Sequence, residues 1–214
     1  MSTRDSKIPR KLPTQERSKE TVKALLDATD SLLATIPVSA LTLTDIAKKS
    51  GITQGSIYQY FPTKEAILAA WEEREWARIS NVVAGTIGKV IEEAPPIEDA
   101  VRRIVRVTTE LVADHARVYT DTGMPDFLSR SDERQRVVAG VVDMIAGAIT
   151  NSPVRASFRV ADPVRAARIV VRVLLTVPPV ANQAKTDAER ARILVDIEDI
   201  VVTYLLGRPL SEDA

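Results

Sequence analysis

The sequence has no cysteine, only one histidine (His115) among 214 residues, and no long uninterrupted apolar run. Without thiols there is no disulfide scaffold or thiolate zinc site, and one imidazole cannot form a histidine-rich catalytic metal site. No apolar stretch approaches the roughly 18 residues that cross a bilayer, and the first residues carry charges and Pro9 in place of a signal-peptide core. We therefore expect a cytoplasmic protein without a metal, a cofactor or a membrane partner.

Charge is unevenly distributed, although 29 basic and 29 acidic residues balance overall. Up to Lys64 there are ten basic and six acidic residues, which leaves an acidic remainder. A basic front part is typical of a chain that binds a polyanion, although solvated helix faces give the same imbalance. Residues 1–14 include four of the basic residues, and we expect a flexible basic tail that either follows a DNA backbone or stays disordered.

The first part of the chain has the pattern of three helices. Apolar residues at spacings of three and four predict a first helix over about 18–35. Thr42 starts a capping-box pattern for a short second helix that ends at Gly51. Thr53 then caps a third helix that runs through Phe61.

The rest of the chain is also helical in pattern, which makes the fold class all-α with about nine helices in total. Thr63 caps a long fourth helix that extends to Ala94, and an apolar stripe from Val101 to Val112 predicts a fifth. Cap signals predict the remaining helices, which follow Ser129, run from Pro163 to Thr176 and run from Thr186 to Leu206, with a polar loop at 151–162.

Residues 42–61, TLTDIAKKSGITQGSIYQYF, form two short helices joined by a tight turn. Their apolar side chains fall where the helices must pack on the first helix. The third helix is only about two turns long, and its remaining face carries hydroxyl, amide and phenol groups, as docking into a major groove requires. The pattern predicts a helix-turn-helix that binds double-stranded DNA.

From Gln15 to about Trp71 the sequence resembles the TetR family of bacterial regulators. The resemblance is carried by LTLTDIAKKSGIT followed by GSIYQYFPTKEAIL, which constrain both the spacing and the identity of many residues. It implies an N-terminal helix-turn-helix DNA-binding domain over 15–75, with its motif at 42–61, followed by a larger helical effector-binding and dimerisation domain over 76–214.

The resemblance implies DNA contacts at eight residues, and two more share the polar face. These ten are expected to act through base edges, phosphates or close backbone approach. For the tyrosines the alternative is packing in the three-helix core, and for the glutamines it is plain solvent exposure. Thr53 and Gln59 are included because they share the polar face, and Lys64 resembles the phosphate-binding lysine of the family. The complete set is Thr42, Thr44, Thr53, Gln54, Gly55, Ser56, Tyr58, Gln59, Tyr60 and Lys64.

Two C-terminal segments, 163–176 and 186–206, are apolar around most of the helical circumference. We expect them to pair with their copies across a two-fold axis as a four-helix homodimer interface, which the resemblance also implies. The alternative is that they form the core of a monomer with solvated charges. The interface residues expected are Arg165, Arg168, Arg172, Leu175, Asp196, Asp199 and Ile200.

The function expected is that of a repressor released from a palindromic operator by a small apolar effector. An effector cavity would hold aromatic and polar side chains, although each of these is equally at home in a core. A regulator without a small-molecule effector is the alternative; an enzyme or carrier on a helical bundle is more distant, since no nucleophile-base set or phosphate loop is present. The candidate effector contacts are Trp76, His115, Tyr119, Met124 and Phe127, with Trp71 beside them.

Overall fold

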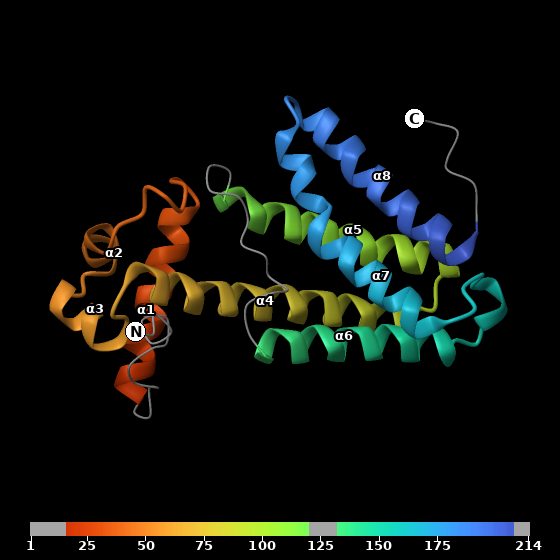
Figure 1. Ribbon diagram of the computed structural model, residues 1–214, viewed down its shortest axis with the longest axis horizontal. Coiled ribbons are helices and arrows are strands. Elements are labelled where there is room, and N and C mark those ends of the chain that lie inside the picture. Colours follow the sequence, from red (N-terminus) through yellow and green to blue (C-terminus); the bar gives the residue numbers. More distant parts are fainter. Residues whose placement is uncertain (1–15, 120–131, 208–214) are drawn as a thin grey trace, which may run out of the picture. The chain divides into compact units, whose positions relative to one another are not determined.

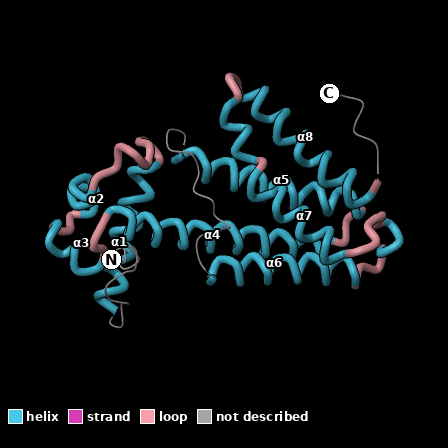
Figure 2. The backbone as a smooth tube through the Cα atoms, viewed as in Figure 1, coloured by secondary structure: helices cyan, strands magenta, loops and turns pink. Residues whose placement is uncertain are grey.

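The computed structural model describes residues 16–119 and 132–207, and within these ranges every regular element is a helix (Figure 2). The predicted all-α class is confirmed. Eight α-helices are described where about nine helices were expected, and short 3-10 segments supply the remaining turns. The basic tail, Met124, Phe127 and the Ser129 cap lie outside the described residues.

The chain divides into two compact units, and the first contains the predicted helix-turn-helix (Figure 1). This unit extends to Arg78 and also includes Val118 and Tyr119, which follow the fifth helix in the chain. Leu25, Ile46 and Ile57 are fully buried in it. Its elements are α1 (Glu16–Leu33), α2 (Leu43–Ser50), α3 (Gln54–Tyr60) and the first part of α4 (Lys64–Glu93).

The second unit takes the remainder of α4 and the four later helices. Within it α6 packs along α7, and α8 packs along α5 (Figure 1). Its main core includes Val105, Val170 and Val201, one from each of α5, α7 and α8. The elements are α5 (Ile97–Ala116), α6 (Asp132–Thr150), η4 (Arg155–Ser157), α7 (Pro163–Thr176), η5 (Pro178–Gln183) and α8 (Asp187–Leu206), and η2 (Arg117–Tyr119) crosses the boundary between the units.

The predicted helix caps are confirmed where they lie in the described ranges. The side chains of Thr42, Asp162 and Thr186 each accept a hydrogen bond from the backbone N–H three residues on. These bonds satisfy donors that a helix start leaves without intrahelical partners. Gly51 and Gly207 end α2 and α8 with φ of 71° and 73°, in the left-handed region that glycine tolerates best.

The loop at 151–162 is less polar in structure than its sequence suggests. Phe158 and Val160 are each 9% exposed and belong to the main core of the second unit. The Arg155 guanidinium donates to their carbonyl oxygens, at 3.1 Å for Phe158 and 2.7 Å for Val160. The arginine therefore satisfies carbonyl oxygens of its own loop, which packs inward.

Ala94 offers a test of the turn that follows α4. It has φ of 45°, in the left-handed region. This backbone conformation costs a residue with a side chain about 1 kcal/mol, whereas glycine adopts it without strain. Ala94→Gly is expected to raise the free energy of unfolding by about 0.5–1 kcal/mol in urea denaturation. Ala84→Gly, at an exposed position inside the same helix, should instead lower it by about 1 kcal/mol. A loss of stability in both variants would contradict the strain at Ala94.

Candidate nucleic-acid interface

The helix α3 presents a polar face because its apolar residues are anchored on the other side. Ile57 is fully buried and Phe61, which ends the helix, is 1% exposed. Gln54, Gly55 and Gln59 are exposed. A short helix held by two buried anchors is a rigid platform for the side chains that point away from the core.

The threonines at the helix starts act first as caps. Thr42 donates its hydroxyl proton to Asp45 Oδ2 at 2.5 Å while its oxygen accepts the Asp45 N–H at 3.2 Å. Thr53 Oγ1 lies 3.0 Å from Ser56 Oγ and accepts the Ser56 N–H. Since a hydroxyl has one proton, Thr42 has none left for a phosphate in this state, whereas one proton of the Thr53–Ser56 pair remains available.

Gln54 and Tyr58 are the side chains of the exposed face best suited to reach a groove. The Gln54 amide donates to Thr44 Oγ1 at 3.3 Å, a long and exposed bond that orients the side chain and is readily given up. Tyr58 is 46% exposed, so the core-packing alternative for this residue does not describe the structure. Its role in binding DNA stays a prediction.

Tyr60 turns toward α1 instead. Its hydroxyl donates to Ser18 Oγ at 3.4 Å and the side chain is half-buried. The packing alternative therefore fits Tyr60 better than it fits Tyr58. Helical periodicity alone does not show which of the two tyrosines packs inward, because they lie at the two edges of the polar face.

Lys64, the first residue of α4, is anchored to the loop between α1 and α2. Its ammonium donates to the carbonyl oxygens of Val38 at 3.2 Å and Ser39 at 3.3 Å. No local sequence pattern predicts these contacts, since the residues are 25 and 26 positions apart. An ammonium has three donors, so the third remains for a phosphate.

The candidate effector residues of the described ranges are divided between the two units. Trp71 is buried in the first unit, where its indole N–H donates to Asp30 Oδ1 at 3.1 Å, and Trp76 is buried in the same unit. Tyr119 donates its hydroxyl to Glu72 Oε1 at 2.6 Å. His115 is 6% exposed on α5 and belongs to the second unit.

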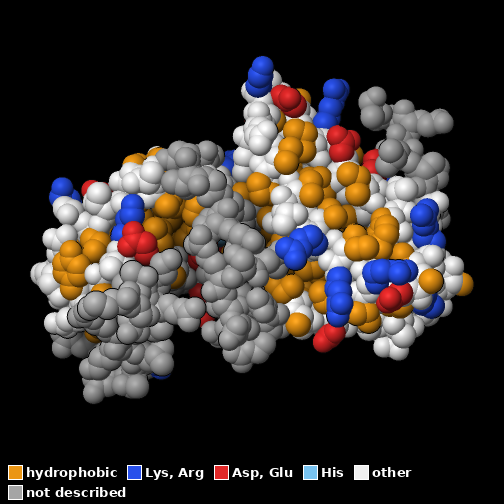
Figure 3. Space-filling view, in the orientation of Figure 1, with side chains coloured by type: hydrophobic (Ala, Val, Ile, Leu, Met, Phe, Trp, Pro, Cys, Tyr) orange, Lys and Arg blue, Asp and Glu red, His pale blue; other side chains and the backbone are white. Residues whose placement is uncertain are grey.

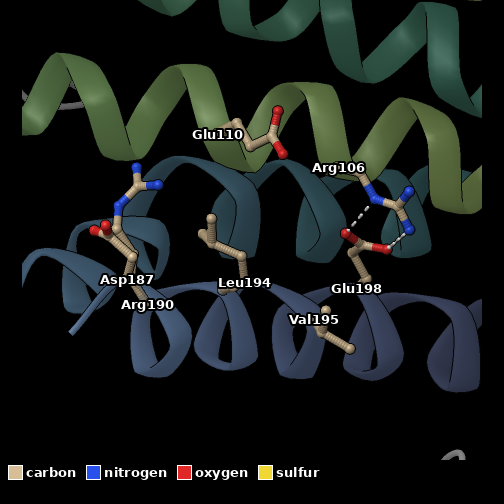
Figure 4. A pocket seen from close by; sticks show the side chains of 8 residues that line it. Arg106, Glu110, Asp187, Arg190, Leu194, Val195 and Glu198 are labelled. Carbon is tan, nitrogen blue, oxygen red and sulfur yellow. Dashed lines mark hydrogen bonds and ion pairs between the residues drawn. The ribbon is translucent and has the colours of Figure 1, made fainter. Parts of the chain in front are cut away.

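A half-open hollow of about 280 Å³ lies between α5 and α8 (Figure 4). The paired Arg106 and Glu198 lie at one end of it, Asp187 and Arg190 at the other, with Leu194 between them (Figure 4). None of the candidate effector residues lines it. Its charged rim is unlike the apolar cavity expected for a small apolar effector.

The predicted interface residues separate into exposed and buried groups. Asp199 is a correction, because it is 7% exposed and pairs at 2.6 Å with Arg102 of α5 in the same chain. It is therefore unavailable to flank a seam between copies. Leu175 is half-buried in the α6–α7 core. The others, Arg165, Arg168, Arg172, Asp196 and Ile200, are exposed.

The sequence patterns do not predict the ion pairs that join α5 and α8. Arg106 holds buried Glu198 with two hydrogen bonds, and Arg190 contacts Asp114 at 2.8 Å. The hydrogen bonds and charge of Glu198 raise the pKa of Arg106 above its usual value. The available signal was a pair of adjacent acids between the apolar residues of the last helix, together with arginines off the apolar stripe of the helix at 97–116.

None of the helices in the described ranges is long and apolar enough to cross a bilayer. Within the same ranges no three histidine, cysteine, aspartate or glutamate side chains gather as a metal site would need.

Comparison with known proteins agrees with the helix-turn-helix geometry. The model of the TetR family of bacterial regulatory proteins matches residues 25–71, which run from α1 through α3 into α4. An uncharacterised HTH-type transcriptional regulator of Mycobacterium tuberculosis is 29% identical over 184 residues, which cover 83% of each chain.

Solved structures share the fold over most of the chain. A TetR-family regulator from Pectobacterium atrosepticum is 18% identical with a TM-score of 0.68, covering 92% of this chain and all of the other. SmeT, the repressor of a multidrug efflux pump of Stenotrophomonas maltophilia, is 19% identical with a TM-score of 0.53, over 89% and 92% of the two chains. The solved structures show the shared fold, while the matched helix-turn-helix segment and the relatives named as regulators identify the chain as a DNA-binding transcriptional regulator of the TetR family.

Proposed function

We propose that this regulator is a homodimeric repressor that binds a palindromic operator through α3 and is released by a small apolar effector. The observation that carries the DNA-binding part is the exposed polar face of α3 around Gly55, opposite fully buried Ile57. Glutamine amides there can read adenine edges, and the absence of a side chain at Gly55 lets the backbone approach the bases.

Dimerisation is supported by apolar side chains left uncovered on the last two helices. Ile169 of α7 is 41% exposed, and Val195 and Ile200 of α8 are 44% and 52% exposed. Figure 3 shows hydrophobic side chains grouped with arginines over α7 and α8. Two recognition helices held about 34 Å apart can read successive major grooves, so a dimer on this face makes a palindrome the natural operator.

Charge at the proposed seam gives a direct test of the dimer. Ile200→Asp places two like charges near a two-fold axis and removes apolar contact. The dissociation constant of the dimer should therefore rise at least tenfold. Ile91→Asp is the matched control, because Ile91 of α4 is even more exposed than Ile200, at 72% against 52%. It should leave the association unchanged. Sedimentation at micromolar concentration measures both. A monomeric parent protein, or equal effects of the two variants, would remove α8 from the interface.

An effector is supported by the family and by one structural neighbour, SmeT, which is the repressor of a multidrug efflux pump. A regulator without an effector is the second candidate. Two observations favour it. The hollow between α5 and α8 is lined by charged side chains, and the Tyr119 hydroxyl already donates its proton to Glu72.

Two measurements test these proposals. Capture of genomic fragments at low and physiological salt should enrich a palindrome, and capture of no preferred sequence would defeat the operator. A ligand that binds the folded state raises the melting temperature and should release the captured operator. A panel of small apolar molecules that does neither favours the regulator without an effector.

A further inference from the structure

Three hydrogen bonds converge on the loop between α1 and α2. The N–H of Val38 donates to the carbonyl oxygen of Val118 at 3.0 Å. On the other side of the same residue, the Val38 carbonyl accepts from the Lys64 ammonium, which also donates to Ser39. One residue therefore joins the segment after α5 to the lysine at the start of α4.

The bond between Tyr119 and Glu72 holds this segment in place. Tyr119 is 5% exposed and Glu72 is 8% exposed, and their oxygens lie 2.6 Å apart. Glu72 is on α4, about two turns after Lys64. Val118 and Tyr119 are thus fixed both to the α1–α2 loop and to α4, which explains why they belong to the first unit although α5 belongs to the second.

The two carbonyl contacts restrict the position of the Lys64 ammonium. Two of its three N–H donors are taken by carbonyl oxygens, which places the ammonium and leaves one donor for another acceptor. A free lysine side chain loses rotamer entropy when it binds, so an ammonium already held in place binds a phosphate at a lower entropic cost.

We propose that Val118 and Tyr119 are positioning residues that set Lys64 for its contact with a DNA phosphate. This inference rests on the proposed role of Lys64 in operator binding. The Tyr119–Glu72 bond fixes the neighbouring Val118, whose carbonyl oxygen accepts the Val38 N–H. The Val38 carbonyl oxygen in turn accepts a hydrogen bond from the ammonium. Any change that displaces the end of α5 then acts on the DNA contact through these bonds.

A double-mutant cycle on operator binding tests the link. Tyr119→Phe removes only the hydroxyl and is expected to weaken operator binding about fivefold, with a salt dependence closer to that of Lys64→Met, which should lose about 0.9 from the slope. In the Lys64→Met background the tyrosine change should have no further effect. In a Gly55→Ala background it should keep its full effect, because Gly55 lies on α3 and not on this chain of bonds.

Several results overturn the proposal. An equal loss from Tyr119→Phe with and without Lys64 shows that the hydroxyl acts elsewhere, and an unchanged affinity in either single variant breaks the link. Amide hydrogen exchange in the DNA-free protein supplies a separate readout: Tyr119→Phe should speed exchange at Val38 at least threefold without lowering the melting temperature of the α5–α8 core. Unchanged exchange overturns the positioning role even if the parent protein binds no operator, which would itself defeat the proposed function.

Discussion

Gly55→Leu is expected to weaken operator binding at least a hundredfold while the protein stays folded. A Cβ built at Gly55 meets no atom within 4 Å, so the free protein accommodates a side chain at this position. Leucine also has a higher helix propensity than glycine by about 0.8 kcal/mol, which offsets any small loss elsewhere. The cost therefore arises only in the complex, where the added side chain occupies the space between α3 and the base edges.

The size of the effect follows from the close approach that the proposed contact needs. A hundredfold loss corresponds to about 2.7 kcal/mol, comparable to the loss of one or two good base contacts. Gly55→Ala should give a smaller loss, so the series measures how tightly the helix fits. Fluorescence anisotropy with the captured operator at fixed salt provides the affinities, and circular dichroism checks the fold.

A matched control separates the contact from a general effect of leucine. Gly85 is also exposed on a helix with nothing within 4 Å of a built Cβ, but it lies on the part of α4 in the second unit. Gly85→Leu should leave operator affinity unchanged. Wild-type affinity in Gly55→Leu would mean that this face of α3 does not enter the groove.

Local features of the fold were predictable because they depend on neighbours in sequence. The caps at Thr42, Asp162 and Thr186 use partners three residues away, and Gly51 ends α2 where its conformational freedom is needed. Periodicity likewise placed Ile57 in the core. In each case one short segment holds all the atoms involved.

Features built from distant residues were not predictable. Asp199 looked like part of a surface stripe because its helix alone cannot show that Arg102 lies against it. Lys64 was assigned to a phosphate from the motif, and its anchoring on Val38 and Ser39 needed the course of the loop. Tyr60 was grouped with Tyr58 although its hydroxyl reaches Ser18 on another helix. Long-range partners decide how a polar side chain is used.

The pair of Arg106 and Glu198 should contribute to the stability of the second unit. Glu198 is 2% exposed, and the guanidinium reaches both carboxylate oxygens, at 2.9 Å and 3.0 Å. Arg106→Met keeps the apolar stem but leaves a buried carboxylate without its counter-charge. Because the Arg106 side chain is 55% exposed, water screens part of the interaction, and we expect the free energy of unfolding to fall by about 2 kcal/mol.

Two variants distinguish loss of the pair from loss of packing. Arg106→Met combined with Glu198→Met replaces the pair by apolar side chains and should recover most of the stability, because no uncompensated charge remains. Arg103→Met removes an arginine whose pair with Glu93 is largely exposed, so it should cost less than about 1 kcal/mol. Urea denaturation of the four proteins at pH 7 gives the comparison.

The double variant decides how the arginine acts. If Arg106 stabilises α5 and α8 by neutralising Glu198, Arg106→Met is less stable than the double variant, because only the single variant leaves a carboxylate in the interior without its counter-charge. A double variant no more stable than Arg106→Met would show that the arginine stabilises α5 and α8 by packing and not by neutralising Glu198.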